Sequence, residues 1–188
     1  AQDIAAADFD PAGIDRDELL YEVELAQTGD QGKWANLTTC RREYFARGIR
    51  VRRGVPLSAM GFQCTQLEEG ASYNTAIYGG YNWRQSTRGC SDGQLMVGLE
   101  GYYEDQRGFN GLRIICGDKE RLEEQQESRI PSSWIGQAKG MHFSRTCPKG
   151  MAVKGATLSR NSRLSKIKLR CQSVTHPEPF ATRRLASA

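Results

Sequence analysis

Apolar residues return along this chain in the same arrangement three times, measured back from a cysteine in each case. Seven, four and two positions before Cys64, Cys116 and Cys171 stand large apolar residues. They are Leu57, Met60 and Phe62 in the first copy, Phe109, Leu112 and Ile114 in the second, and Leu164, Ile167 and Leu169 in the third. Because alternate side chains of a β-strand share one face, this spacing predicts a half-buried strand that ends at each of these cysteines.

A second set of matching positions is anchored on the cysteine that opens each copy. Cys40, Cys90 and Cys147 are each followed, eight positions later, by a glycine, and each copy is preceded by a tryptophan. The glycines are Gly48, Gly98 and Gly155, and the tryptophans are Trp34, Trp83 and Trp134. Two independent anchors with the same neighbours identify a threefold internal repeat with a period of roughly 50 residues.

The repeat and the composition together predict an all-β protein. The 188 residues include 20 glycines and six prolines, which suits a turn-rich sheet protein better than a helical bundle. We expect one domain over residues 19–175, with repeats over residues 28–80, 81–130 and 131–175. Residues 20–25 should add a strand that turns Tyr21, Val23 and Leu25 inward. Residues 118–128 are rich in helix formers with interleaved charges and predict a short exposed helix or a charged loop.

The two ends of the chain are expected to lie outside this domain, as an acidic arm at residues 1–18 and a tail at residues 176–188. Residues 1–25 contain eight acidic residues and one arginine, whereas the remainder is basic. The arm could fold back on the basic body, which is the simpler interpretation, or reach a neighbouring subunit. Ala1-Gln2-Asp3 resembles the start of a chain after removal of a signal peptide. No apolar run approaches the roughly 18 residues of a membrane span.

The six cysteines predict three disulfides. In each copy one strand begins at the first cysteine and another ends at the second, so antiparallel pairing would bring the two sulfur atoms within reach. The expected pairs are Cys40–Cys64, Cys90–Cys116 and Cys147–Cys171, although six cysteines allow other connectivities. An even set without a remainder favours an oxidising compartment, secreted or periplasmic, over buried free thiols in the cytosol. The sequence has no Cys-x-x-Cys pair and only two distant histidines. We therefore expect no metal site, and no other cofactor.

An arginine cluster in the first repeat is a candidate site for anions or for a protein partner. It comprises Arg41, Arg42, Arg47, Arg50, Arg52 and Arg53. Guanidinium groups match phosphate and sulfate, but a solvated strand face would have the same composition. No aromatic residues alternate with these arginines as in a platform for stacking bases, so we do not expect nucleic acid. Asn36-Leu37-Thr38 is a sequon, which makes Asn36 a candidate glycosylation site.

Tyrosines near glycines offer candidate contacts to sugar rings. Tyr73, Tyr78 and Tyr81 lie between the first and second repeats, around Gly79 and Gly80. The alternative interpretation is that these tyrosines pack at the junction between repeats. In the second repeat, Glu104 and Asp105 follow two further tyrosines and complete the candidate glycan-binding set.

These motifs resemble those of the vitelline membrane outer layer protein I family. The matching segments are Gly32-Lys33-Trp34 before Cys40, Cys147-Pro148-Lys149-Gly150, and Phe109-Asn110-Gly111-Leu112-Arg113-Ile114-Ile115-Cys116. The resemblance spans residues 20–173 and implies a β-prism of three four-stranded antiparallel Greek-key sheets around a pseudo-threefold axis. A β-trefoil is the alternative fold. An Asp-Asp-Thr-Ala loop typical of the family is only faintly matched here, at Asp105.

Three functions compete at this stage. The resemblance implies a secreted, non-catalytic protein of a coat, matrix or surface layer, with glycan contacts and extracellular protein partners. A second hypothesis is an assembly subunit, in which the acidic arm docks on the arginine-rich face of a neighbour, another copy included. A third is a transferase or hydrolase acting on amino-sugar polymers, with Glu100, Glu104 and Asp105 as its carboxylates. Whether the protein is an enzyme stays open, and the lack of a nucleophile motif or phosphate loop favours a non-catalytic role.

Overall fold

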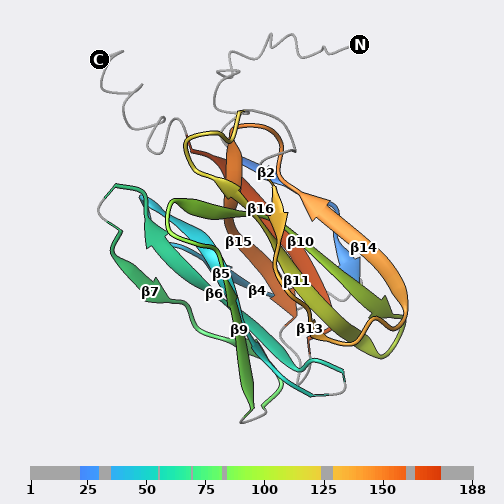
Figure 1. Ribbon diagram of the computed structural model, residues 1–188. Helices are drawn as coiled ribbons and strands as arrows, with labels where there is room; N and C mark the ends of the chain where they lie inside the picture. Colours follow the sequence, from blue (N-terminus) through green and yellow to red (C-terminus); the bar gives the residue numbers. More distant parts are fainter. Residues whose placement is uncertain are drawn as a thin grey trace, which may run out of the picture.

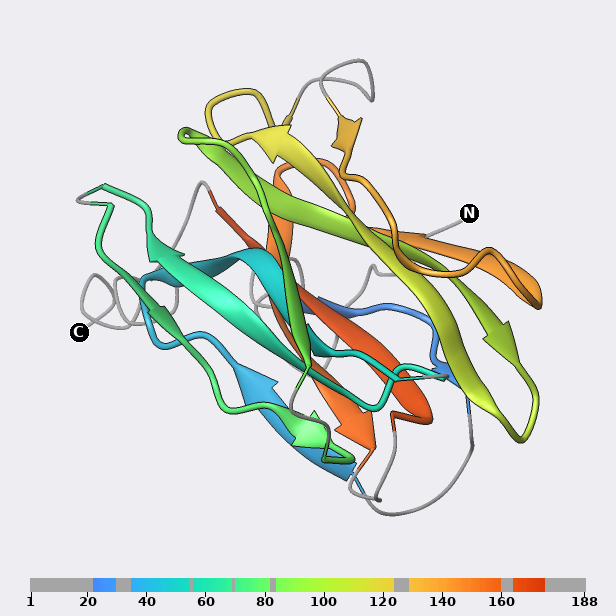
Figure 2. The ribbon, with the colours of Figure 1, turned by 60° about the horizontal axis from the view of Figure 1, so that its bottom comes forward.

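The fold consists of three antiparallel β-sheets that stand as the three sides of a prism (Figures 1 and 2). The structure is a computed structural model, and it describes residues 22–29, 35–54, 56–68, 70–81, 84–123, 129–159 and 164–174. The expected arm and tail, Tyr21, Trp34 and Trp83 lie outside the described residues. Within them, no helix is long and apolar enough to cross a membrane.

Each sheet has a central pair of long strands. Sheet 1 is built from β5 (Tyr44–Arg52) and β6 (Ala59–Gln66), with β9 (Gln85–Gly89) beside β5, and β7 (Ser72–Asn74) and β8 (Tyr78–Gly79) beside β6. Sheet 2 is built from β10 (Gln94–Glu104) and β11 (Gly108–Asp118), with β14 (Met141–Thr146) beside β10, and β12 (Ile130–Pro131) and β13 (Ile135–Gly136) beside β11. Sheet 3 is built from β15 (Met151–Ser159) and β16 (Lys166–Ser173), with β4 (Ala35–Thr39) beside β15, and β2 (Glu22–Glu24) and β3 (Thr28–Gly29) beside β16.

This arrangement confirms the expected β-prism and excludes the β-trefoil. Each sheet has four strand positions, because the two short strands on one side occupy a single interrupted edge. The sheets do not coincide with the three consecutive repeats. The strand before each first cysteine pairs with the sheet that precedes it in the chain, so β9 joins sheet 1 and β14 joins sheet 2. The strand before Cys40, β4, pairs with β15 of sheet 3, whose long strands come last in the chain. The two ends of the domain therefore share sheet 3 (Figure 2).

The apolar rows expected from the repeat form the core. All nine residues counted back from the second cysteines are buried, with exposed fractions of 3% or less. Val23 and Leu25 pack against the same core, while Glu22 and Glu24 face solvent, as the alternation predicts. The strict two-residue alternation holds in β2, whereas β10 has five consecutive buried residues, Leu95–Leu99, of which Leu95 and Val97 pack in a second cluster with Phe45.

The helix expected at residues 118–128 does not form in the part that the structure describes. Strand β11 runs on to Asp118, and residues 119–123 form turns; residues 124–128 lie outside the described part. The interpretation treated this segment as exposed because Leu122 is its one apolar residue, but Leu122 is only 9% exposed and packs with Phe45, Leu95 and Ala152. Its carbonyl also accepts a hydrogen bond of 2.8 Å from the amide of Gly150. Burial of this one leucine thus outweighs the helix preference of its charged neighbours.

Each of the three cysteine pairs lies at a junction between two sheets. The disulfides are Cys40–Cys64, Cys90–Cys116 and Cys147–Cys171, the pairing that the repeat predicts. The amide of each first cysteine donates to the carbonyl of a bulged residue in the neighbouring sheet. These bonds run from Cys40 to Lys154 (2.9 Å), from Cys90 to Arg47 (2.7 Å) and from Cys147 to Val97 (2.8 Å).

The glycine of each repeat follows the bulged residue and makes the junction possible. A Cβ atom on Gly48 would lie 2.3 Å from the carbonyl oxygen of Arg88, on the arriving strand. At Gly98 and Gly155 the corresponding distances, to Arg145 and Thr38, are 2.7 and 2.3 Å. No side chain fits against a backbone oxygen at such distances, so the spacing of eight residues from the cysteine reflects a backbone-to-backbone contact.

We expect Gly48→Ala to lower the free energy of unfolding by about 2 kcal/mol or more, because the added methyl group must push two strands apart. Gly89 is the matched control. It pairs with Gly48 across the ladder, and its Cβ would meet only the flexible end of Gln63, at 3.1 Å. Gly89→Ala should cost less than about 1 kcal/mol. Urea unfolding of both variants measures the difference, and equal losses would contradict the proposed contact.

Candidate functional site

The three candidate tyrosines of sheet 1 differ in what they contact. Tyr78 on β8 is half-buried and packs against the core, as does Tyr73 on β7. Tyr81 is 84% exposed, and the guanidinium carbon of Arg52 lies 5.5 Å from its ring centre. Of these three rings, Tyr81 is therefore the one that presents a free face to solvent.

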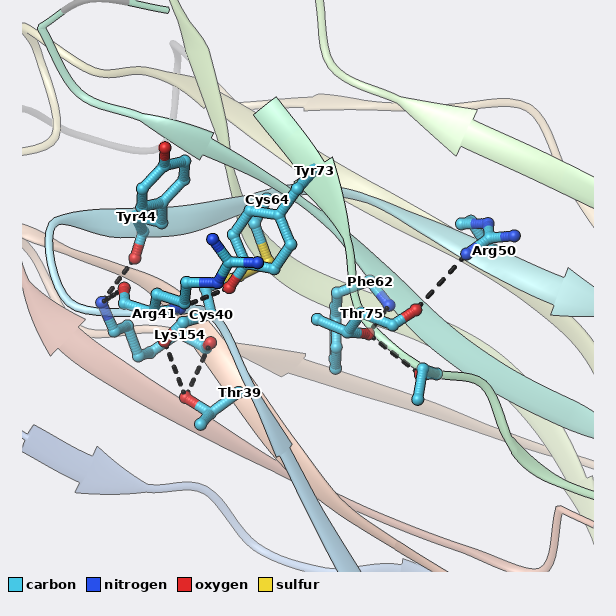
Figure 3. The surroundings of a disulfide bond; sticks show 11 residues. Thr39, Cys40, Arg41, Tyr44, Arg50, Phe62, Cys64, Tyr73, Thr75 and Lys154 are labelled. Atoms are coloured by element: carbon cyan, nitrogen blue, oxygen red, sulfur yellow. Dashed lines mark hydrogen bonds between the residues drawn. A yellow bond between two sulfur atoms is a disulfide. The ribbon is translucent and has the colours of Figure 1, made fainter. Parts of the chain in front are cut away.

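Tyr73 belongs to a cluster of three contacting side chains, Arg41, Tyr44 and Tyr73, beside the Cys40–Cys64 disulfide (Figure 3). We call this cluster the Arg41 clasp. The guanidinium of Arg41 lies 4.0 Å from the centre of the Tyr73 ring, and the amide of Arg41 donates to the Tyr73 hydroxyl at 2.5 Å. The edge of Tyr44 meets the same ring, with 5.0 Å between the centroids. These contacts hold the turn after Cys40 against β7, so Tyr73 has a packing role.

Lys154, the bulged residue of β15, binds the same turn through hydrogen bonds from its side chain. Its ammonium group donates to the carbonyls of Arg41 (2.7 Å) and Tyr44 (2.5 Å) (Figure 3). The same group lies 4.8 Å from the centre of the Phe45 ring. Burial lowers the pKa of Lys154 to about 8, although the nearby charge of Glu43 opposes that shift. The cation is thus used to close the junction between sheets 3 and 1.

The candidate arginines do not converge on one point. Arg50 donates to the carbonyl of Thr75 (3.3 Å), Arg52 to that of Gly80 (3.4 Å) and Arg47 to that of Cys90 (2.9 Å). Arg41, Arg42 and Arg53 are exposed. Three of the six thus hold backbone carbonyl groups, which is a structural use of the guanidinium. An anion or partner contact at the exposed members stays a prediction, as does docking of the arm.

Asn36 lies on β4, in the row that faces the core. It pairs with the buried Leu158 and is itself half-buried, and the hydroxyl residue of its sequon, Thr38, is 4% exposed. Glycosylation at Asn36 stays a prediction, and any glycan there would have to leave along the edge of the sheet.

The two carboxylates at the tip of the β10–β11 hairpin, Glu104 and Asp105, have different roles. Glu104 accepts a hydrogen bond of 2.7 Å from the amide of Asn110, which also donates to the carbonyl of Lys139 at 2.8 Å. Lys139 and Arg107 lie at ion-pair distance from Glu104, whereas Asp105 is exposed in the turn. Glu104 therefore anchors the loop after β13, and Asp105 remains accessible.

The outer face of sheet 2 carries a polar row centred on Glu100. This residue lies in the middle of β10, not in a loop as the sequence interpretation had it. One carboxylate oxygen accepts a hydrogen bond of 2.7 Å from Arg113, and the other accepts one of 2.5 Å from His142. Burial alone would raise the pKa of Glu100, but these two bonds and the charges of the donors outweigh it, and the pKa is lowered from 4.5.

An aromatic row runs beside the polar row. The rings of Trp134 and Tyr102 lie 5.2 Å apart between centroids, and Tyr102 and His142 lie 5.3 Å apart. The guanidinium of Arg113 lies 4.5 Å from the Trp134 ring and so connects the two rows. The rings stand side by side because Tyr102 pairs with His142 on one side and with Gly111 on the other, where no side chain intervenes.

A shallow hollow adjoins the polar row on its other side. It is lined by Glu100, Ile115, Arg129, Pro131, Ser144 and Thr146. The carboxylate of Glu100 therefore stands between the aromatic row and the hollow. Together these features place aromatic surface, hydroxyl groups and charged hydrogen-bonding groups on one face of one sheet.

The arrangement does not resemble a pair of catalytic carboxylates. Glu100 and Glu104 are four residues apart on one extended strand, which separates their Cα atoms by roughly 13 Å. In glycosidases the two carboxyl groups of the catalytic pair are about 5–10 Å apart. The lowered pKa of Glu100 also opposes a role as general acid. No group of potential metal ligands occurs among the described residues.

The sequence interpretation missed the residues that the fold brings together here. Trp134 was noted only as a marker of the repeat, and His142 only as too distant from the other histidine for a metal site. The alternation of Glu100, Tyr102 and Glu104 along one strand was the available signal for a shared outer face. The cross-strand partners Arg113 and His142 depend on register, which a single sequence does not supply.

Comparisons with known proteins agree with this architecture. The family model described as Vitelline membrane outer layer protein I (VOMI) matches residues 21–171. The Malaysian banana lectin superposes with a TM-score of 0.58 at 17% identity, covering 80% of this chain and 98% of that chain. A mannose-specific jacalin-related lectin from Morus nigra, in complex with mannose, gives a TM-score of 0.59 at 13% identity, with 81% and 95% covered.

Artocarpin complexed with methyl-α-mannose gives a TM-score of 0.60 at 9% identity, with 81% of this chain and 98% of that chain covered. At such identities the likeness shows the β-prism fold alone. In the comparison with curated protein sequences, nothing matches significantly.

Lys154 should make stability rise with pH above 8. The folded protein releases this proton near pH 8, whereas the unfolded chain keeps it up to its ordinary pKa of 10.5. The unfolded state therefore binds more protons between these values, and the free energy of unfolding increases with pH there. Urea unfolding of the natural protein and of Lys154→Met at pH 7.5 and pH 10 isolates this contribution. A difference between the two proteins that stays constant with pH would exclude it.

Glu100→Gln should lower the free energy of unfolding at pH 7 by about 1 kcal/mol, because the negative charge that faces Arg113 is removed and one of the two acceptor oxygens becomes an NH2 donor. The pKa of Glu100 is lowered in the folded state, so its contribution is complete above pH 4.5 and is lost as the pH falls through the folded value. The gap between the natural protein and the variant should thus shrink at pH 3.5. Urea titrations at both pH values provide the measurement, and a gap that widened in acid would contradict the assignment.

Proposed function

We propose that this chain, which belongs to the vitelline membrane outer layer protein I family, is a secreted, non-catalytic protein that binds carbohydrate through the outer face of sheet 2. In this proposal it contributes to an extracellular surface layer, coat or matrix by holding glycans. Sugar recognition is a binding function, so it requires no cofactor and no catalytic pair.

The observation that carries the proposal is the aromatic row of Trp134, Tyr102 and His142 beside the polar row of Arg113 and Glu100. A pyranose ring has an apolar face of C–H groups and a rim of hydroxyl groups. Its recognition therefore calls for aromatic surface next to fixed donors and acceptors, held on rigid elements. The outer face of sheet 2 offers both, on three paired strands and the segment before β13.

The charges of this face are already oriented in the free protein. Glu100 is 16% exposed and is held at both oxygens, so it can accept hydrogen bonds from sugar hydroxyl groups without first rearranging. Such preorganisation lowers the entropic cost of binding. His142 is 46% exposed and borders the same carboxylate, which leaves an edge that a ligand can reach.

The disulfides support an extracellular setting. All three pairs close within the prism, and no free cysteine occurs among the described residues. Disulfides of this kind persist in oxidising compartments and are reduced in the cytosol. The mannose named for two of the structurally similar lectins makes mannosides a rational first probe for this chain.

Binding to a glycan array should identify a ligand, and Tyr102→Ala and Trp134→Ala should each weaken it at least tenfold, which corresponds to about 1.4 kcal/mol. The stacking surface is lost in both variants. Tyr81→Ala is the control, because this ring is exposed on sheet 1, away from the proposed surface. Unfolding midpoints of all variants show whether the fold is retained.

The proposal is wrong if the natural protein binds no glycan at all, or if Tyr81→Ala removes binding while Tyr102→Ala leaves it intact. In the second case the sugar-binding surface would lie on sheet 1, where the three candidate tyrosines of the sequence interpretation are.

A further inference from the structure

The hollow beside Glu100 has a feature that a binding site for neutral sugars does not need, a guanidinium group in its wall. We propose that this hollow is a subsite for an anionic group, a carboxylate or a sulfate, carried by an acidic sugar. The inference rests on the proposed function, since it names the class of sugar that the outer face of sheet 2 would select.

The hollow lies beside Gly98, in a row of side chains that crosses sheet 2. Gly98 pairs with Ile115 on one side and with Thr146 on the other, and both of these neighbours line the hollow. The methyl group of Thr146 lies 2.8 Å from the position of a Cβ atom on Gly98. The glycine that the junction requires therefore adds no side chain of its own to this part of the outer face.

The equivalent rows of the other two sheets are occupied. In sheet 1 the Gln63 side chain covers the paired glycines, since its amide oxygen lies 2.6 Å from the Cβ position of Gly48 and 3.1 Å from that of Gly89. In sheet 3 the equivalent residue is Arg170, whose guanidinium is ion-paired with Glu22. Sheet 2 has the shorter, apolar Ile115 at this position, so the depression stays open there.

Arg129 points its charge toward this depression from the segment before β12. Its guanidinium is half-buried and donates one hydrogen bond of 3.0 Å to the carbonyl of Cys147. Among the described residues, no carboxylate lies at ion-pair distance from it, and burial lowers the pKa of Arg129. Among the described residues this cation makes one hydrogen bond and keeps further N–H donors, and a guanidinium fork can bind a carboxylate or a sulfate through two parallel hydrogen bonds.

The one acidic side chain in the lining does not cancel this charge. Glu100 already accepts hydrogen bonds from Arg113 and His142, and the charge of Arg113 offsets its own. The hollow therefore keeps the positive charge of Arg129. The hydroxyl groups of Ser144 and Thr146 add neutral donors from the opposite wall. An acidic sugar can place its anion at Arg129 and its ring against Ile115 and Pro131, and the chain of sugars can continue over the aromatic row.

The test compares three forms of one oligosaccharide, neutral, carboxylated and sulfated, by calorimetric titration against the natural protein. We expect both anionic forms to bind at least tenfold more tightly than the neutral form at 50 mM salt. Arg129→Gln should abolish this preference and leave the affinity for the neutral form within about twofold. A preference for one anionic form over the other identifies carboxylate or sulfate as the recognised group.

Two further variants make the result specific. Arg84→Gln removes the same charge from an exposed site on the sheet 1 side, outside the candidate arginine cluster, and should leave the preference unchanged. Ile115→Gln places a longer side chain over Gly98, as Gln63 does in sheet 1, and should remove the preference without changing the charge. Equal binding of neutral and anionic forms to the natural protein overturns the inference, as do equal losses in Arg129→Gln and Arg84→Gln.

The two proposals fail in different ways. If neutral forms bind and Tyr102→Ala weakens them, but acidic forms have no advantage, the subsite is absent and the glycan-binding face remains. If no form binds, both proposals are wrong.

Discussion

The whole prism depends on how closely the strand before each first cysteine approaches the neighbouring sheet. At three equivalent junctions a cysteine amide donates to the carbonyl of a bulged residue, and the glycine that follows the bulge leaves room for a backbone oxygen of the arriving strand. Because β4 makes the third of these contacts with β15, the same interaction that links successive sheets also joins the last sheet to the strand that precedes Cys40. The disulfides then fix the strand ends at which the contact occurs.

This junction constrains the inner faces more than the outer ones. Inner rows from three sheets must fill one core, so equivalent positions hold apolar side chains throughout, all of them buried. Outer rows meet only water and are free to diverge. Two residues beyond the repeated glycine, the three sheets carry Arg50, Glu100 and Thr157 on their outer faces. Function can therefore differ between sheets that share one architecture.

This difference between the constrained inner faces and the free outer faces explains what the sequence could predict. Repeat spacing reveals the inner rows, the disulfide pairs and the β-prism, because each of these is repeated three times and the coincidences accumulate. The outer cluster occurs once, so no repetition marks it, and its members come from three different segments joined by register. Tyr73 shows the converse error. Its ring is near glycines in sequence, but the Arg41 clasp and the core occupy it. The burial of Leu122 was not predicted, because one apolar residue among charges gives no periodic signal.

Sheet 2 is the favoured binding face because it retains hydrogen-bonding capacity that the other two sheets use internally. On sheet 1, Arg50 and Arg52 bind backbone carbonyls, and Gln63 covers the glycines. On sheet 3, Lys168 and Arg170 are ion-paired with the glutamates of β2. On sheet 2 the internal pairing of Glu100 leaves an aromatic row uncovered on one side and the half-buried cation of Arg129 on the other. A buried charge that the protein itself does not neutralise is costly for a fold to maintain. A ligand with both an apolar ring face and a negative charge would compensate this charge and cover the half-buried rings of Tyr102 and Trp134.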